Sequence, residues 1–83
     1  METISHTLNT LKIGEMGIIE NLNCTGNIRR RLLDLGMVKG THILPVLSSP
    51  SGGLTAYEIR NSIIAIREED SQNIIISSNF AET

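Results

Sequence analysis

The stretch that decides the fold is Ile28-Arg29-Arg30-Arg31-Leu32-Leu33-Asp34-Leu35-Gly36-Met37. Ile28, Leu32 and Leu35 are spaced i, i+4 and i+7, so they would lie on one face of a helix. Gly36 can adopt the left-handed conformation that ends a helix, and an apolar residue such as Met37 often follows it. The pattern therefore predicts one short helix from Ile28 to Leu35, closed by Gly36.

The rest of the chain has the pattern of short strands separated by turn signals. The predicted strands are Gly17–Leu22, Thr41–Ser48, Leu54–Arg60, Ile63–Arg67 and Asn73–Ser78. Pro45 cannot donate a ladder hydrogen bond, so its strand should lie at an edge or be bulged there. Asn61-Ser62 is the expected two-residue turn between the third and fourth of these strands. The sequence thus predicts a mostly β fold, a small barrel of about five strands with one short helix inserted between the first two.

Size and composition limit the possible classes of protein. The 83 residues suit a single domain over 1–83, and the polar ends, residues 1–6 and 79–83, should be loose. Aromatic residues make up only 2%, which removes the stacking platforms of single-strand binders, and the net charge of −2 argues against duplex binding. No nucleic-acid partner is expected. Cys24 is the only cysteine, and no stretch is long enough to span a membrane, so a cytoplasmic location is predicted.

Residues for catalysis or metal binding are sparse. Cys24 has no histidine near it in sequence, and His6 and His42 are isolated from other ligand types. The adjacent carboxylates of Glu68–Asp70 would point in different directions on a helical turn, so they cannot all face one ion. We therefore expect no enzyme activity, no catalytic residue, no cofactor and no metal ligand.

The run Arg29–Arg31 is the most distinctive charged feature. Consecutive helical residues are about 100° apart, so at most two of these side chains can face one partner. One interpretation is a solvated helix face whose arginine stems cover apolar surface. The other is a docking face for an acidic protein partner, since arginine is enriched at interfaces. The residues alone leave both interpretations open.

Three segments form an ordered set of motifs. The first is Arg30-Arg31-Leu32-Leu33-Asp34-Leu35-Gly36, followed after a short gap by Gly40-Thr41. The second is upstream, with Leu8, Leu11, Gly14, Gly17 and Ile19. The third runs from Tyr57-x-Ile59-Arg60 through Ile64-Ala65-Ile66-Arg67 to Glu69. In this order and spacing they resemble the FeoA family, the small cytoplasmic partners of the bacterial ferrous-iron transporter FeoB, and the likeness extends from about Leu8 to Ile76.

This resemblance implies an SH3-like β-barrel with its helix between the first and second strands. It also implies an accessory role in ferrous-iron uptake through contact with the cytoplasmic region of FeoB, so that the chain would be peripheral to the membrane only through that partner. The alternative function is a stand-alone metal-responsive regulatory module, like the C-terminal domain of iron-dependent repressors. The predicted partner-binding residues combine the helix, the turn after it and the Ser48–Gly53 loop: Arg29, Arg30, Leu33, Met37, Lys39, Pro50, Gly52 and Gly53.

Overall fold

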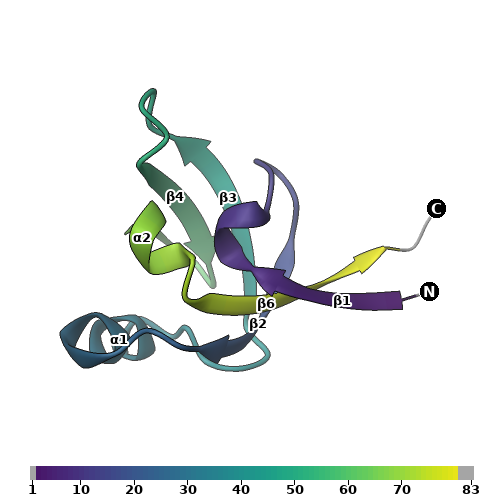
Figure 1. Ribbon diagram of the computed structural model, residues 1–83, viewed down its shortest axis with the longest axis horizontal. Coiled ribbons are helices and arrows are strands. Elements are labelled where there is room, and N and C mark those ends of the chain that lie inside the picture. The colour runs from purple at the N-terminus through teal and green to yellow at the C-terminus, as the bar shows by residue number, and fades with distance from the viewer. Residues whose placement is uncertain (1, 81–83) are drawn as a thin grey trace.

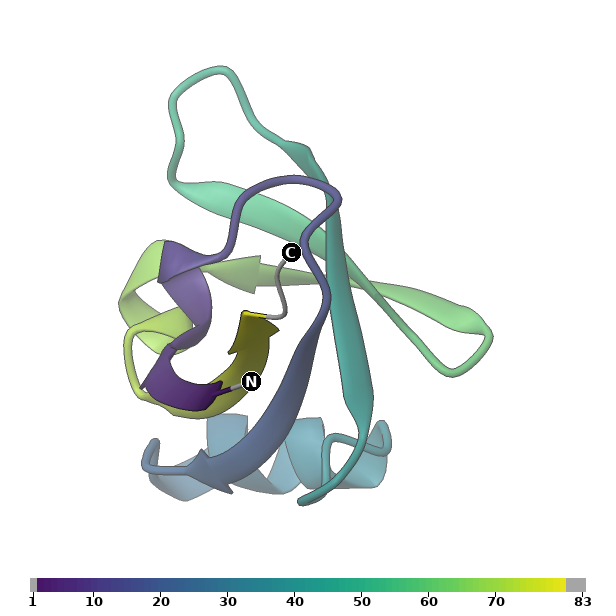
Figure 2. The ribbon, with the colours of Figure 1, turned by 90° about the vertical axis from the view of Figure 1, so that its right-hand side faces the viewer.

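The computed structural model describes residues 2–80, which form a six-stranded antiparallel sheet and three short helical segments (Figure 1). The strands are β1 (Glu2–Thr7), β2 (Gly17–Leu22), β3 (His42–Ser48), β4 (Leu54–Ile59), β5 (Ser62–Arg67) and β6 (Ile74–Phe80). The helical segments are η1 (Leu8–Thr10), α1 (Gly26–Asp34) and α2 (Glu68–Ser71). Helix α1 lies across one end of the curled sheet, and the β3–β4 connection forms the opposite end (Figure 2).

The strand order is β1-β6-β2-β3-β4-β5, so β1 and β5 are the two ends of an open sheet. The predicted mostly β, small-barrel fold is confirmed, with six strands instead of about five. The additional strand is β1, which falls where the sequence predicted a loose end, and it pairs with β6 from Glu2↔Phe80 to Thr7↔Ile75. Strand β6 also extends to Phe80, whereas the predicted loose residues 1 and 81–83 lie outside the described part. With β1 present, α1 follows the second strand and not the first.

One turn and one bulge show how strand pairing sets the register. Ile59 pairs with Ser62, so Arg60 and Asn61 form the β4–β5 turn, one residue earlier than the predicted Asn61-Ser62. The positive φ belongs to Arg60 (53°) and not to Asn61. Strand β3 is paired on both sides, with a register shift between Pro45 and Leu47. The prediction of a bulge at the proline is therefore confirmed, and the edge alternative is wrong.

The core is aliphatic and lies inside the curl of the sheet. Its buried members are Leu8, Leu11, Ile19, Leu22, Cys24, Leu32, Met37, Ile43, Tyr57, Ile59, Ile66, Ile74 and Ile76. Helix α1 contributes Leu32, with Ile28 and Leu33 packed against the cluster. The prediction that Leu35 completes this face is wrong, because Leu35 is 40% exposed. The helix has already ended at Asp34, and the fully buried Met37 takes the core position instead.

Tyr57 gives this core a measurable pH response. Its side chain is 2% exposed, and burial raises the pKa of its hydroxyl above the ordinary value of 10.0. Because the unfolded chain then ionises first, the free energy of unfolding should be steady below pH 10 and fall as the pH rises above it. Urea unfolding at several pH values should show that the free energy of unfolding falls more steeply above pH 10 in the wild type than in Tyr57→Phe. Equal slopes in the two proteins would contradict the raised pKa, and the single tyrosine makes the absorbance titration unambiguous.

Candidate functional site

The end of α1 is a complete Schellman motif. The Gly36 amide donates to the Leu33 carbonyl and the Met37 amide to the Leu32 carbonyl, both at 3.0 Å, with Gly36 at φ +100°. The Gly40 amide donates to the Ile19 carbonyl at 2.7 Å, which ties the following turn to β2. This α1–β3 turn, residues 36–41, therefore has a fixed position beside the helix.

A groove lies between α1, β2 and the α1–β3 turn. Its volume is about 230 Å³, and its lining residues are Glu20, Asn21, Leu22, Arg29, Leu33, Val38 and Lys39. Three predicted partner-binding residues, Arg29, Leu33 and Lys39, are thus brought together. Arg30 lies in an adjoining hollow of about 370 Å³ that Arg29 and Leu33 also line. We call these two depressions together the α1 groove.

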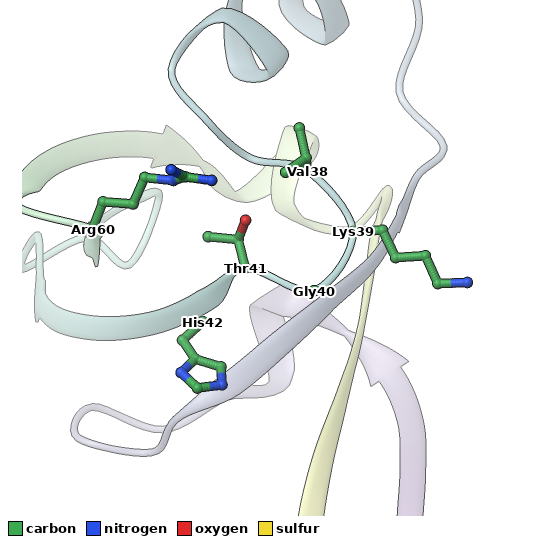
Figure 3. A pocket seen from close by; sticks show the side chains of 6 residues that line it. All are labelled: Val38, Lys39, Gly40, Thr41, His42 and Arg60. Carbon is green, nitrogen blue, oxygen red and sulfur yellow. The ribbon is translucent and has the colours of Figure 1, made fainter.

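A second hollow lies on the other side of the α1–β3 turn (Figure 3). We call it the Arg60 hollow; its volume is about 430 Å³ and its lining is Val38, Lys39, Gly40, Thr41, His42 and Arg60. The Arg60 guanidinium points into the space between Val38 and Thr41, whereas Lys39 and His42 point away from it (Figure 3). Arg60 is the cationic residue that points into the hollow, and none of the six lining residues is a carboxylate. The hollow therefore suits an anionic group.

Sequence reasoning missed Arg60. Its place at a hairpin tip carries no local signal of a site, because the turn approaches α1 only after β4 and β5 have paired with the sheet. The contact is close: a Cβ added at Gly36 would lie 3.1 Å from Nε of Arg60 and 3.3 Å from its Cδ. The Arg60 side chain thus lies directly over the glycine that ends α1.

The structure separates the remaining predicted residues from this surface. Met37 is fully buried: as the second residue after the end of α1, it points into the core and not toward this surface. Pro50, Gly52 and Gly53 lie in the β3–β4 connection, at the end of the sheet opposite α1 (Figure 2). There Pro50 lines an apolar groove of about 410 Å³ with Leu47, Ser48, Ser49, Leu54, Ala56 and Ala65. The predicted partner-binding residues are therefore divided between the two ends of the fold.

Exposed apolar and cationic side chains meet at the α1 end of the fold. Val38, 40% exposed, lines both the α1 groove and the Arg60 hollow, with cationic side chains on either side of it.

Over residues 2–80, no group of three or more His, Cys, Asp and Glu side chains is placed to hold a metal ion. His6 is hydrogen-bonded to the hydroxyls of Thr10 and Ser78, and Cys24 is buried. None of the helices described is long and apolar enough to cross a membrane.

Comparison with known proteins agrees with the resemblance seen in the sequence. Residues 6–78 match the family model described as the FeoA domain. A Campylobacter jejuni protein named Fe(2+) transport protein A is 31% identical over 71 residues, which cover 86% of this chain and 96% of that protein. The match therefore includes nearly the whole length of the relative.

Solved structures confirm the SH3-like fold. The FeoA protein of Chlorobium tepidum superimposes with a TM-score of 0.86 at 22% identity, covering 93% of this chain and 73% of that one. Stenotrophomonas maltophilia FeoA, a zinc complex described as a procaryotic SH3 domain protein, has a TM-score of 0.74 at 26% identity, with coverages of 84% and 87%. A manganese-dependent transcriptional repressor complexed with manganese has a TM-score of 0.80 at 13% identity, over 90% of this chain but 37% of the repressor.

Proposed function

Because this chain belongs to the FeoA family of ferrous-iron transport proteins, we propose that it is a non-catalytic accessory protein of ferrous-iron uptake. It acts in the cytoplasm by binding the cytoplasmic region of the transporter FeoB, and it reaches the membrane only through that partner. The observation that carries this proposal is the α1 end of the fold, where Arg29, Leu33 and Lys39 line one groove around the exposed Val38.

This surface has the properties of a protein-binding site. Arginine is enriched at protein interfaces and among the residues that contribute most to binding, and the centre of an interface is more apolar than the rest of a protein surface. The Schellman motif and the Gly40–Ile19 hydrogen bond hold the turn rigid, so little conformational entropy is lost on binding. The α1 groove is shallow, which suits contact with another protein surface better than enclosure of a small substrate.

Direct binding tests the proposal. The purified chain should bind the purified cytoplasmic region of FeoB from the same genome in isothermal titration calorimetry, with and without guanine nucleotide. Amide NMR shifts should be largest over α1 and the α1–β3 turn. Lack of binding at high micromolar concentration under both conditions would refute this function.

Charge reversal on α1 tests the surface itself. Arg29→Glu combined with Arg30→Glu should weaken FeoB binding by roughly tenfold or more, because steering and contact with an acidic partner are both lost. Each single variant, Arg29→Glu or Arg30→Glu, is compared with Arg31→Glu as the matched control, since Arg31 is exposed on the same helix but lines neither part of the α1 groove. An equal loss in the control would assign the effect to net charge and not to this surface.

A second candidate function is a stand-alone metal-responsive regulatory module. It is favoured by the likeness in fold to the manganese-dependent repressor. The chain would then bind ferrous or manganous ion itself and change conformation. Titration with either ion, followed by amide NMR shifts, tests this function: saturable shifts at His6, His42 and Glu68–Asp70 would support it, and unchanged spectra at those residues would exclude it.

A further inference from the structure

The backbone of Arg60 is held in an unfavourable conformation. Among the residues that the structure describes, it is the one non-glycine residue with positive φ, at 53°. The left-handed region is costly for a side chain that bears Cβ, and glycine or asparagine normally occupies such turn positions. Backbone strain of this kind tends to persist where the side chain has a function.

The strained turn delivers the guanidinium to a specific place. The hairpin tip carries Arg60 across Gly36, and its side chain becomes one wall of the Arg60 hollow, opposite Val38 and Thr41 (Figure 3). A guanidinium has five N–H donors, and the lining of this hollow supplies no carboxylate to accept them. The Thr41 hydroxyl donates to the Gly36 carbonyl at 3.2 Å. The hollow therefore presents a cation without an anionic partner.

The rest of the lining points to the kind of anion. The Gly40 and Thr41 amides are not free to form a phosphate cradle, because Gly40 donates to the Ile19 carbonyl and Thr41 to the Val38 carbonyl. The guanidinium remains as the main donor. Its planar fork matches a carboxylate as well as a phosphate, and the use of these two amides within the fold favours the carboxylate. Val38, 40% exposed at the rim, adds an apolar contact that a free ion would not use.

We propose that the Arg60 hollow binds a carboxylate of an acidic segment of the protein partner, paired with the Arg60 guanidinium while a neighbouring apolar side chain of that segment packs on Val38. The hollow and the α1 groove share Val38 and Lys39, so one partner segment crosses the α1–β3 turn and contacts both. The identity of the partner as FeoB rests on the proposed function, whereas the chemistry of the hollow does not.

Substitutions at Arg60 separate binding from folding. Arg60→Asn removes the guanidinium and places a residue that tolerates positive φ at the turn, so the Tm should be unchanged or raised. Its affinity for the FeoB cytoplasmic region should fall by roughly tenfold or more, and Arg60→Lys, which keeps the charge but not the fork, should give an intermediate loss. Unchanged affinity in Arg60→Asn would overturn the proposal. A loss of affinity accompanied by a lowered Tm would also overturn it, because the lost affinity and the lowered Tm would then both follow from a structural role of Arg60.

Peptides test the hollow without FeoB. A blocked synthetic peptide containing Glu-Leu-Glu should shift the Arg60 guanidinium and the Val38 methyl NMR signals of the wild-type chain, and the matched Gln-Leu-Gln peptide should not. Shifts from the acidic peptide in a chain that fails to bind FeoB would refute the proposed function and support this inference. If Arg60→Asn binds FeoB as tightly as the wild type and the acidic peptide causes no shifts, the proposed function would be supported and this inference refuted. Equal shifts from inorganic phosphate and the acidic peptide, without a response at Val38, would also overturn the inference.

Discussion

Replacing Met37 with alanine is expected to lower the free energy of unfolding by about 2–5 kcal/mol, the usual cost of truncating a large buried side chain. Met37 is fully buried and belongs to the same core cluster as Leu32. It is also the residue whose amide closes the Schellman motif, so the truncation removes the apolar contact that accompanies that ending of α1. Urea unfolding followed by circular dichroism gives the measurement.

Two variants serve as controls for Met37→Ala. Met37→Leu keeps the volume of the side chain and should cost less than about 1.5 kcal/mol. Val38→Ala truncates the next residue along the chain, which is 40% exposed, and should cost much less than Met37→Ala. Similar small losses in all three proteins would mean that Met37 does not pack in the core, and its prediction as a partner contact would stand again.

The local sequence was sufficient to predict the parts of the fold that depend on neighbouring residues. The existence of helix α1 and its ending at Gly36 were predicted, although the spacing of Ile28, Leu32 and Leu35 placed its start at Ile28 and the structure begins it at Gly26. The bulge near Pro45 was predicted from a missing donor. These features follow from properties of a few consecutive residues, so a pattern in the sequence is enough to find them.

Features that depend on long-range pairing could not be predicted in this way. Strand β1 has only one apolar residue, Ile4, and therefore no alternating pattern, and it forms because β6 offers an edge. The position of Arg60 depends on the register of β4 and β5, which shifted the expected turn by one residue. Of the predicted partner-binding residues, Arg29, Leu33 and Lys39 line one groove, but no local pattern indicated that the Ser48–Gly53 loop lies at the other end of the sheet.

Gly36→Ala should lower the free energy of unfolding by about 1–3 kcal/mol, because φ +100° is strained for any residue that bears Cβ. The added methyl group would also lie 3.1 Å from Nε of Arg60, closer than side-chain contacts normally come, so the guanidinium has to move. The variant should therefore shift the Arg60 side-chain NMR signals and weaken binding at the Arg60 hollow. Urea unfolding and the NMR spectrum measure the two effects separately.

Gly52→Ala is the matched control for this variant. Gly52 has φ +80° but nothing within 4 Å of an added Cβ, so its substitution carries the backbone cost without a collision and leaves the Arg60 signals unchanged. Combining Gly36→Ala with Arg60→Asn removes the crowding. The free energy of unfolding of the double variant should therefore be higher, by roughly 0.5 kcal/mol or more, than the value expected from adding the effects of the two single changes. Additive losses would show that Arg60 does not lie over the end of α1, and the carboxylate-binding hollow would lose the wall on which it depends.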